Sequence, residues 1–331
     1  MQHSDVFYTD RYEIYEDQFN SLKAGRKARR KRNPEPHHTP KRSRQQVLEQ
    51  ISEELQGDEV GFKTTYHPSR HEEGWLLDSI RNFYEEALIN DVLAMVRGGK
   101  EASVYRCAAD PSTGVALLAA KVYRPRQFRN LRNDALYRGG REILTAGGHA
   151  VRSDDHRTIR AIGKKSAYGV QVSHTSWLTH ELVSMQKLHD AGGAVPKPYA
   201  GGENAILMSY VGDERTAAPT LNNVRLEDDE AEYVFEEVMR NVKLMLTHNL
   251  IHGDLSAYNI LYWDEEITLI DFPQVVNAAN NDMAYPILLR DVQRICEYFD
   301  MQRFHRDPEV VTRNLWQQYG PEQPNILLTV E

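Results

Sequence analysis

Residues 250–272, LIHGDLSAYNILYWDEEITLIDF, decide how the rest of the chain is interpreted. The polar motif HGD at 252–254 is followed by two short apolar segments, NILYW and EITLI, which have the length and composition of strands. Asn259 follows Asp254 by five residues, and Asp271 follows Asn259 by twelve, directly after the second segment. The pattern therefore predicts two carboxylates and one amide at fixed places around a hairpin.

These residue types suit phosphoryl transfer. That reaction needs a carboxylate near the attacking nucleophile, oxygen ligands for Mg²⁺, and cations that hold the phosphates. Mg²⁺ prefers oxygen ligands and keeps several waters, so one or two protein side chains suffice. The H-x-D-x-x-x-x-N…D spacing resembles the catalytic loop and the metal-binding Asp of protein kinases. The alternative is an ordinary polar turn and a strand-end Asp, which the joint spacing disfavours.

Small-molecule kinases of the aminoglycoside and choline type share this arrangement, so the N-terminal half must separate the classes. It contains neither GxGxxG nor GxxxxGK[ST]. In their place GGKEASVY occupies 98–105, and Lys121 follows Tyr105 by sixteen residues in the segment AAKVYR. A turn between apolar runs, followed by an apolar run that ends in a lysine, predicts strands with a cation at one end.

GGKEASVY, AAKVYR, HGDLSAYN and LIDF together resemble the RIO family of atypical serine/threonine protein kinases. WLTHELVSMQKLHDAGGAVPKP, LMSYVGDE, APTL and LLRDVQRICEYF extend the resemblance over about 90–303. In that family a G-K-E-A-x-V-Y turn replaces the glycine loop, and a long flexible loop follows the strand lysine. The resemblance implies an α+β, bilobal protein-kinase-like fold. Its small N-lobe is rich in β-strands, its larger C-lobe is helical, and ATP binds between them.

The resemblance also implies roles for the residues of the decisive stretch. Asp254 and Asp271 would be the catalytic residues, with Asp254 orienting or deprotonating the acceptor hydroxyl. Asn259 and Asp271 would hold Mg²⁺, with Mn²⁺ as a substitute. The family's counterpart of Asp271 is also implicated as a phosphoryl acceptor. His252 is expected to brace the catalytic loop rather than to transfer protons.

The ATP site follows from the resemblance in the same way. Lys121 would contact the α- and β-phosphates and pair with Glu181 on the helix after the long loop. Ser103 would approach the phosphates together with backbone N–H groups of the turn, and residues 208–211 would form the hinge beside adenine. A solvated lysine and a water-facing glutamate are the alternatives for the first two. The ATP-binding set implied by the resemblance is Gly99, Lys100, Ser103, Lys121, Glu181, Met208, Tyr210 and Val211.

Some features depart from the usual protein-kinase pattern. Pro273 stands two residues after Asp271, where many protein kinases have Gly, and no APE motif follows. NAANNDMAY is too short for a conventional activation loop with a peptide-docking region. RIO proteins also lack these parts, which agrees with the resemblance but removes the usual reason to expect a peptide substrate.

The periodicity divides the chain into an extension, a folded part and a tail. Helices are expected at about 75–88, 174–192, 231–249 and 284–303. The weakly patterned residues 124–172 are expected to form a mobile functional loop or to be partly disordered. The predicted divisions are an N-terminal extension at 1–60 that is largely disordered, a RIO-type kinase domain at 73–305 with an N-lobe at 73–208 and a C-lobe at 212–305, and a C-terminal tail at 306–331.

Charge and composition bound the partners. Residues 23–44 hold ten Lys and Arg and one acid, a local balance of +9 in a chain of net charge −8. Such a stretch is interpreted either as an arm that contacts RNA or a ribosomal particle or as a solvated tail. No apolar run approaches the roughly 18 residues that span a bilayer, and no signal peptide is recognised. With only two cysteines, far apart, a cytoplasmic protein without a membrane partner is expected.

The sequence therefore predicts an ATP- and Mg²⁺-dependent phosphotransferase of RIO type. It would be a serine/threonine kinase acting on a protein or on itself, an ATPase, or both, and the resemblance links it to ribosome assembly. One alternative is a small-molecule kinase, against which GKEASVY and APTL speak. The other is a non-catalytic ATP-binding scaffold, which the complete set of catalytic residue types disfavours.

Overall fold

The structure is a computed structural model, and every structural statement below concerns the residues that it describes. These are 64–99, 101–124, 143–145, 147–152, 154–164 and 166–321. Four parts of the chain lie outside them: the predicted extension at 1–60 with its basic stretch at 23–44, the position of Lys100, residues 125–142 of the predicted loop, and residues 322–331. None of the described helices is long and apolar enough to cross a membrane.

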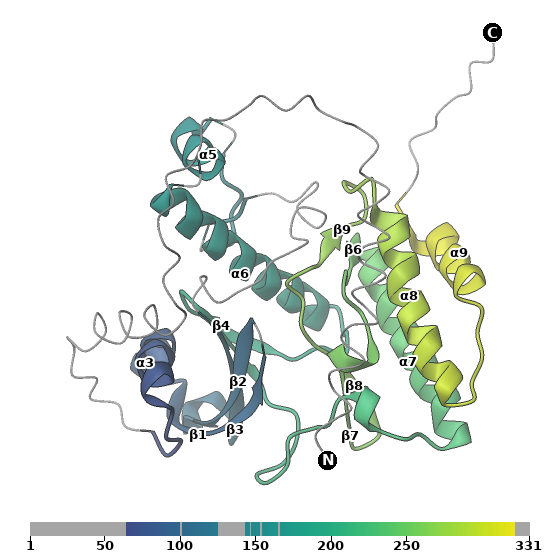
Figure 1. The fold of residues 1–331 in the computed structure, drawn as a ribbon, viewed down its shortest axis with the longest axis horizontal. Helices are drawn as coiled ribbons and strands as arrows, with labels where there is room; N and C mark the ends of the chain where they lie inside the picture. The colour runs from purple at the N-terminus through teal and green to yellow at the C-terminus, as the bar shows by residue number, and fades with distance from the viewer. Residues whose placement is uncertain are drawn as a thin grey trace, which may run out of the picture. The chain divides into compact units, whose positions relative to one another are not determined.

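The N-terminal lobe is built on a five-stranded antiparallel sheet with the strand order β1-β2-β3-β5-β4. Helix α3 (Arg70–Glu85) packs on one face of this sheet, and helix α6 (Ala167–Asp190) contacts β4 and β5 (Figure 1). The strands are β1 (Ile89–Gly98), β2 (Ala102–Ala109), β3 (Leu117–Tyr123), β4 (Pro198–Gly201) and β5 (Ala205–Ser209), and the short helix η1 (Pro111–Thr113) lies between β2 and β3.

Strand alternation gives the sheet two apolar faces with different neighbours. On β3, Leu118, Ala120 and Val122 belong to a buried cluster with α3. Ala119 and Tyr123, on the opposite face, belong to the main core, which continues into the C-terminal lobe. The second face is therefore the one that reaches toward the rest of the molecule.

Part of the segment expected to be a mobile loop is helical. Helix α5 spans His156–Gly163, and α6 begins seven residues before the expected start at 174. Asp155 caps α5 by accepting the Thr158 N–H, and Ser166 caps α6 by accepting the Gly169 N–H. Sequence periodicity did not reveal these parts because α5 has only eight residues and because α6 shows little amphipathic periodicity over its length.

Close helix crossing explains the glycine at the start of α6. A Cβ atom at Gly169 would lie 2.1 Å from the Ala161 carbonyl oxygen on α5, which leaves no room for a side chain.

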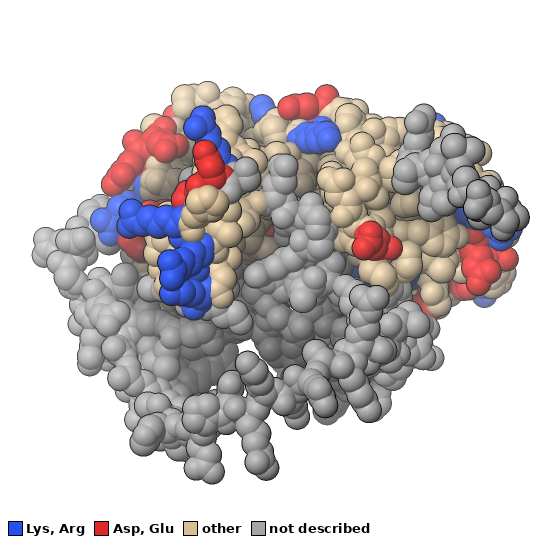
Figure 2. Space-filling view, turned by 90° about the horizontal axis from the view of Figure 1, so that it is seen from above, with Lys and Arg blue, Asp and Glu red and all other residues tan. Residues whose placement is uncertain are grey.

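Arg157, Arg160 and Lys164 of α5 are exposed. The Lys and Arg side chains seen in Figure 2 gather mainly toward the end of the molecule at which α5 lies in Figure 1.

The C-terminal lobe is mainly helical. Helices α7 (Asp228–Thr247) and α8 (Ala284–Met301) lie side by side, and α9 (Pro308–Tyr319) packs against both (Figure 1). Two small antiparallel sheets complete the lobe. They pair β6 (Leu250–Ile251) with β9 (Val276–Asn277) and β7 (Ile260–Trp263) with β8 (Glu266–Leu269), beside the short helices η3 (Leu221–Asn223) and η4 (Ala257–Asn259).

Helix α9 lies within the segment that was predicted to be a tail. Asp307 caps it by accepting the Glu309 and Val310 N–H groups, and Pro308 occupies its first turn. Thr312 is fully buried, and Leu315 packs against the main core. The folded part therefore continues beyond 305, because this short helix covers α7 and α8. The α+β fold with a strand-rich N-lobe and a helical C-lobe is otherwise as predicted.

Candidate active site

The loop between β6 and η4 holds the HGD motif in one backbone conformation. Gly253 has φ +80°, which L side chains rarely adopt, and a Cβ atom there would lie 2.2 Å from the Gln274 carbonyl oxygen. Gln274 lies three residues after Asp271. The glycine is therefore required, because the backbone that follows Asp271 packs against the catalytic loop and leaves no room for a side chain at residue 253.

His252 joins the same two segments through its ring. Its Nε2 lies 3.1 Å from the carbonyl oxygen of Ile270, and the Asp254 N–H lies 3.3 Å from its Nδ1. A neutral ring protonated on Nε2 satisfies both contacts, since one nitrogen then donates and the other accepts. The Phe272 ring packs against it with centroids 4.9 Å apart. His252 thus braces the loop, as predicted.

Helix α8 holds the catalytic loop through three buried charged side chains. Asp291 Oδ2 accepts the Gly253 N–H at 2.7 Å, and Arg290 Nη2 donates to the Gly253 carbonyl oxygen. Arg290 also pairs with Asp291 Oδ1 at 3.0 Å. Arg294 Nη1 donates to Asp254 Oδ1 at 2.8 Å. LLRDVQRICEYF entered the resemblance only as a sequence likeness, so these contacts were not predicted. The charged residues within an otherwise apolar helix were the signal that could have indicated them.

Asp254 is a partly buried carboxylate with a partner on each oxygen. Besides Arg294 on Oδ1, the Asn259 side-chain N–H group lies 3.3 Å from Oδ2 and 2.9 Å from the Asp254 carbonyl oxygen. The Asp254 side chain remains 32% exposed. Burial raises the pKa of Asp254 above its ordinary value, and the Arg294 charge only partly opposes this, while the Asp271 charge adds to the rise. Asn259 thus helps to fix the orientation of Asp254.

Lys121 joins the N-lobe to Asp271. Its Nζ lies 2.5 Å from Glu181 Oε1 on α6 and 2.5 Å from Asp271 Oδ1. The Tyr123 hydroxyl donates to the other oxygen of Glu181, since Tyr123 stands two residues along β3 and shares the face of Lys121. Lys121 and Glu181 are buried, whereas the Asp271 side chain is 40% exposed. Residues from β3, α6 and the segment after β8 therefore meet at one cation.

This cluster is charged at neutral pH. Burial alone would lower the pKa of Lys121, but the charges of Asp271 and Glu181 hold it well above its ordinary value. Burial alone would raise the pKa of Asp271, but the charge of Lys121 and the hydrogen bond from it hold that pKa below its ordinary value. Asp271 also has φ +72°, a conformation that aspartate tolerates better than most residues. The carboxylate stays ionised and aimed at Lys121.

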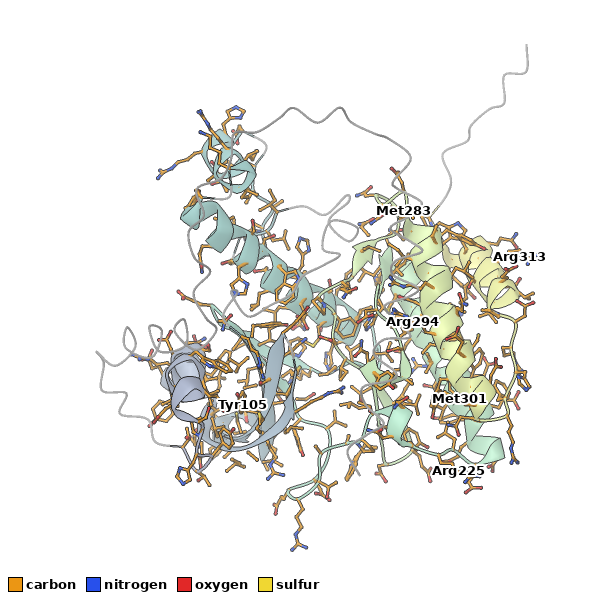
Figure 3. The ribbon with its side chains drawn as sticks, viewed as in Figure 1. Tyr105, Arg225, Met283, Arg294, Met301 and Arg313 are labelled. Atoms are coloured by element: carbon orange, nitrogen blue, oxygen red, sulfur yellow. The ribbon has the colours of Figure 1, made fainter. Side chains whose placement is uncertain are left out.

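Ser103 is not brought to this cluster. It is buried on β2 beside Tyr105, on the face that packs under α3, whereas Lys121 faces the main core. Tyr105 donates from that face to Glu72 of α3. Figure 3 shows Tyr105 beside this helix. Because side chains alternate along a strand, the Ser103 hydroxyl points away from the position expected for it at the phosphates. Only its backbone stays near the turn.

Gly99, Met208, Tyr210 and Val211 are the other predicted residues that the structure describes. Gly99 begins the β1–β2 turn, and its N–H donates to the Ala102 carbonyl oxygen at 2.8 Å. Met208 lies near the end of β5 and packs in the main core. The Val211 carbonyl oxygen accepts the Ala218 N–H at 3.1 Å. Tyr210 packs partly buried beside Met208, and Lys100 is not described, so the ATP-binding roles of this set stay predictions.

Arg97 is a cation that the sequence analysis did not single out. Its Nη1 lies 3.5 Å from the Tyr258 carbonyl oxygen, inside the loop between Asp254 and Asn259. Its charge also contributes to the lowered pKa of Asp271. The end of β1 thus approaches the catalytic loop.

Comparisons with a family model and with single proteins both find RIO proteins similar to this chain. The model of the RIO domain matches residues 149–311. The chain is 30% identical over 207 residues to RIO-type serine/threonine-protein kinase Rio1 of Haloferax volcanii, covering 62% of this chain and 61% of that protein. It is 28% identical over 216 residues to the protein of the same name from Methanocaldococcus jannaschii, covering 65% of each. The chain thus spans somewhat less than two thirds of the length of these two relatives.

A solved structure extends the comparison to the fold. The Rio2 kinase of Chaetomium thermophilum, solved as an ADP/Mg²⁺-phosphoaspartate complex, aligns with a TM-score of 0.51 and 20% identity. The alignment covers 75% of this chain and 67% of that one. At this identity the likeness concerns the fold, and it agrees with the lobes described above. Together with the sequence relatives, it supports one conclusion: residues 149–311 of this chain are similar to the RIO domain, within a protein-kinase-like fold.

Proposed function

We propose that the chain is an ATP- and Mg²⁺-dependent phosphotransferase. It moves the γ-phosphate to a serine or threonine of another protein or of the chain itself, or to water. The observation that carries this proposal is the position of Lys121 Nζ, 2.5 Å from both Glu181 and Asp271. A cation suited to phosphate is thereby placed beside a carboxylate suited to a metal. The names of the relatives as serine/threonine-protein kinases support the same activity.

The donor set fits Mg²⁺. Asp271 is ionised at neutral pH and partly exposed, and Asn259 supplies an amide oxygen from the adjacent η4. Hard oxygen ligands of this kind are those that Mg²⁺ takes in nucleotide sites. When bound, the ion neutralises charge on the phosphate oxygens. Lys121 then holds the α- and β-phosphates, and Asp254 orients the acceptor hydroxyl and takes up its proton.

A labelling assay tests the proposal. The full chain is incubated with Mg²⁺ and γ-labelled ATP, and free phosphate and labelled protein are followed separately for wild type, Asp254→Ala and Asp271→Asn. We expect both signals to depend on both residues. Acid-stable label indicates a serine or threonine acceptor, and hydroxylamine-labile label that Asp271→Asn abolishes indicates an aspartyl phosphate. Equal inactivity of wild type and variants would overturn the proposal, and much faster turnover on a sugar or amino alcohol would favour a small-molecule kinase.

We further propose that residues 23–44 contact RNA or a ribosomal particle in the cytoplasm. The support is their local balance of +9, which favours binding to polyanions. Binding to RNA should weaken when residues 1–45 are deleted and when the salt concentration is raised. Unchanged affinity after the deletion would contradict a role for this arm.

A further inference from the structure

Helix α8 contacts the catalytic loop through residues that do two different things. Arg290 and Asp291 bind the peptide groups on either side of Gly253, so they hold the backbone. Arg294 instead binds the Asp254 carboxylate itself, at 2.8 Å. Arg294 lies midway along α8, between Met283 and Met301 at its two ends (Figure 3). The helix therefore fixes both the loop and the direction of its functional side chain.

We propose that Arg294 is a positioning residue for phosphoryl transfer: it occupies Asp254 Oδ1 and thereby presents Oδ2 to the acceptor hydroxyl. This inference rests on the proposed function. It assigns to Arg294 a role that the sequence motifs did not suggest, since the catalytic-loop motif supplied Asp254, Asn259 and Asp271 but gave no role to α8.

Burial makes this contact hard to exchange. The Arg294 side chain is only 5% exposed, so the close packing around it leaves it little freedom to move away from Asp254. A charge-assisted hydrogen bond of 2.8 Å also restricts rotation of the carboxylate. The Asn259 side chain approaches the other oxygen more loosely, at 3.3 Å. Oδ1 is therefore the anchored oxygen, and Oδ2 is the one that can exchange its partner for an acceptor.

Nucleotide binding has a different basis. Lys121 is positioned by β3, Glu181 and Asp271, and its contacts are separate from the Arg294–Asp254 pair. Loss of Arg294 should therefore lower the turnover number and leave nucleotide affinity nearly unchanged. Misplacing a reacting group by about 1 Å costs about 10²-fold in rate.

The test uses the full chain as wild type, Arg294→Gln, Arg294→Lys and Arg313→Gln. The last is a matched control, because Arg313 is an exposed arginine on α9. Turnover of γ-labelled ATP, the Kd of a fluorescent ADP analogue, and thermal unfolding are measured for each. We expect Arg294→Gln to lower kcat about 10²-fold with Kd within about twofold, and Arg294→Lys to recover at least about tenfold of that loss. Arg313→Gln should match the wild type.

A double variant separates action through Asp254 from a general packing effect. If Arg294 acts by orienting Asp254, adding Arg294→Gln to Asp254→Asn should slow turnover little beyond Asp254→Asn alone. The inference is overturned if Arg294→Gln keeps wild-type kcat, if its slowing simply multiplies with that of Asp254→Asn, or if kcat, Kd and thermal stability fall together without recovery in Arg294→Lys. A wild type without turnover refutes the proposed function instead, before any variant is compared.

Discussion

Asp254 and Asp271 lie in one site, but the two are held in opposite ways. Asp254 belongs to a loop that is fixed from within the C-lobe by α8, whose Arg294 lies 40 residues further along the chain. Asp271 pairs with Lys121, which lies 150 residues away in the N-lobe. Burial raises the pKa of Asp254, whereas Lys121 holds that of Asp271 below its ordinary value.

The difference separates two kinds of preorganisation. The Asp254 half depends on backbone contacts and a buried helix, so it forms whenever the C-lobe folds. The Asp271 half depends on β3 and α6 as well, so its geometry follows the relative placement of the lobes. Substitutions in the first half should affect stability and turnover, and those in the second should also affect nucleotide binding.

The largest expected effect is on the Asp271 half. Asp271→Asn removes the charge that faces both Lys121 and the proposed Mg²⁺, so ATP turnover should fall at least about 10²-fold, because such an ion supplies several kcal/mol of charge stabilisation. The measurement is phosphate release across a range of Mg²⁺ concentrations, in which the variant should need more metal. Asp282→Asn, at an exposed aspartate, is the control. Unaltered metal dependence would remove Asp271 from the metal site.

The backbone of the Asp254 half should be the next most sensitive feature. Gly253→Ala forces a Cβ atom toward the Gln274 carbonyl oxygen at positive φ, and we expect a loss of about 3 kcal/mol in the free energy of unfolding in urea. Gly114→Ala is the matched control, because Gly114 has φ +75° with nothing within 4 Å of the added atom. It should cost only about 1 kcal/mol. Equal losses would show that the close approach to Gln274 carries no energy.

These two halves also differ in how far the sequence predicted them. The motif spacing supplied Asp254, Asn259, Asp271 and Lys121, because phosphoryl transfer demands these residue types in a recognisable order. Glu181 followed only through the resemblance, and the structure brings it to 2.5 Å from Lys121. Most helices followed from periodicity, and the two lobes followed from the resemblance.

What the sequence did not provide is contact information across the chain. Arg294 reads as one charge in an amphipathic helix until its distance to Asp254 is known. Ser103 was expected at the phosphates, but strand register places its side chain on the opposite face of the sheet from Lys121. Helices α5 and α9 are short and depend on caps and packing, so periodicity did not reveal them.

A smaller effect should come from the hydroxyl that supports the Lys121 pair. Tyr123→Phe removes the donor to Glu181 and leaves a buried carboxylate oxygen without that partner. We expect a loss of about 1–2 kcal/mol in the free energy of unfolding and weaker nucleotide binding, since Glu181 can then move away from Lys121. Urea unfolding and nucleotide titration measure the two effects. Tyr233→Phe, at a tyrosine that is 56% exposed, should change neither stability nor nucleotide binding. If Tyr233→Phe lowers both as much as Tyr123→Phe does, the contact with Glu181 is not the cause.

The smallest expected effect has opposite signs in the two halves. In metal-free buffer at pH 7, Asp271→Asn should lower the free energy of unfolding and Asp254→Asn should raise it, each by about 1 kcal/mol, because solvent screens both partly exposed side chains. The reason is linkage. A carboxylate with a lowered pKa stabilises the folded state when ionised, and one with a raised pKa destabilises it.

Acidification should then separate the two halves. The advantage of Asp254→Asn is complete above the raised pKa of folded Asp254 and disappears as the pH falls through it toward 3.8, the ordinary value. The deficit of Asp271→Asn persists down to about that ordinary value and disappears only below it, as the pH falls through the lowered pKa of folded Asp271. Urea unfolding between neutral and acidic pH measures both windows. If both variants shift stability in the same direction, the two carboxylates are not held in opposite ways, because only opposite pKa shifts produce opposite signs.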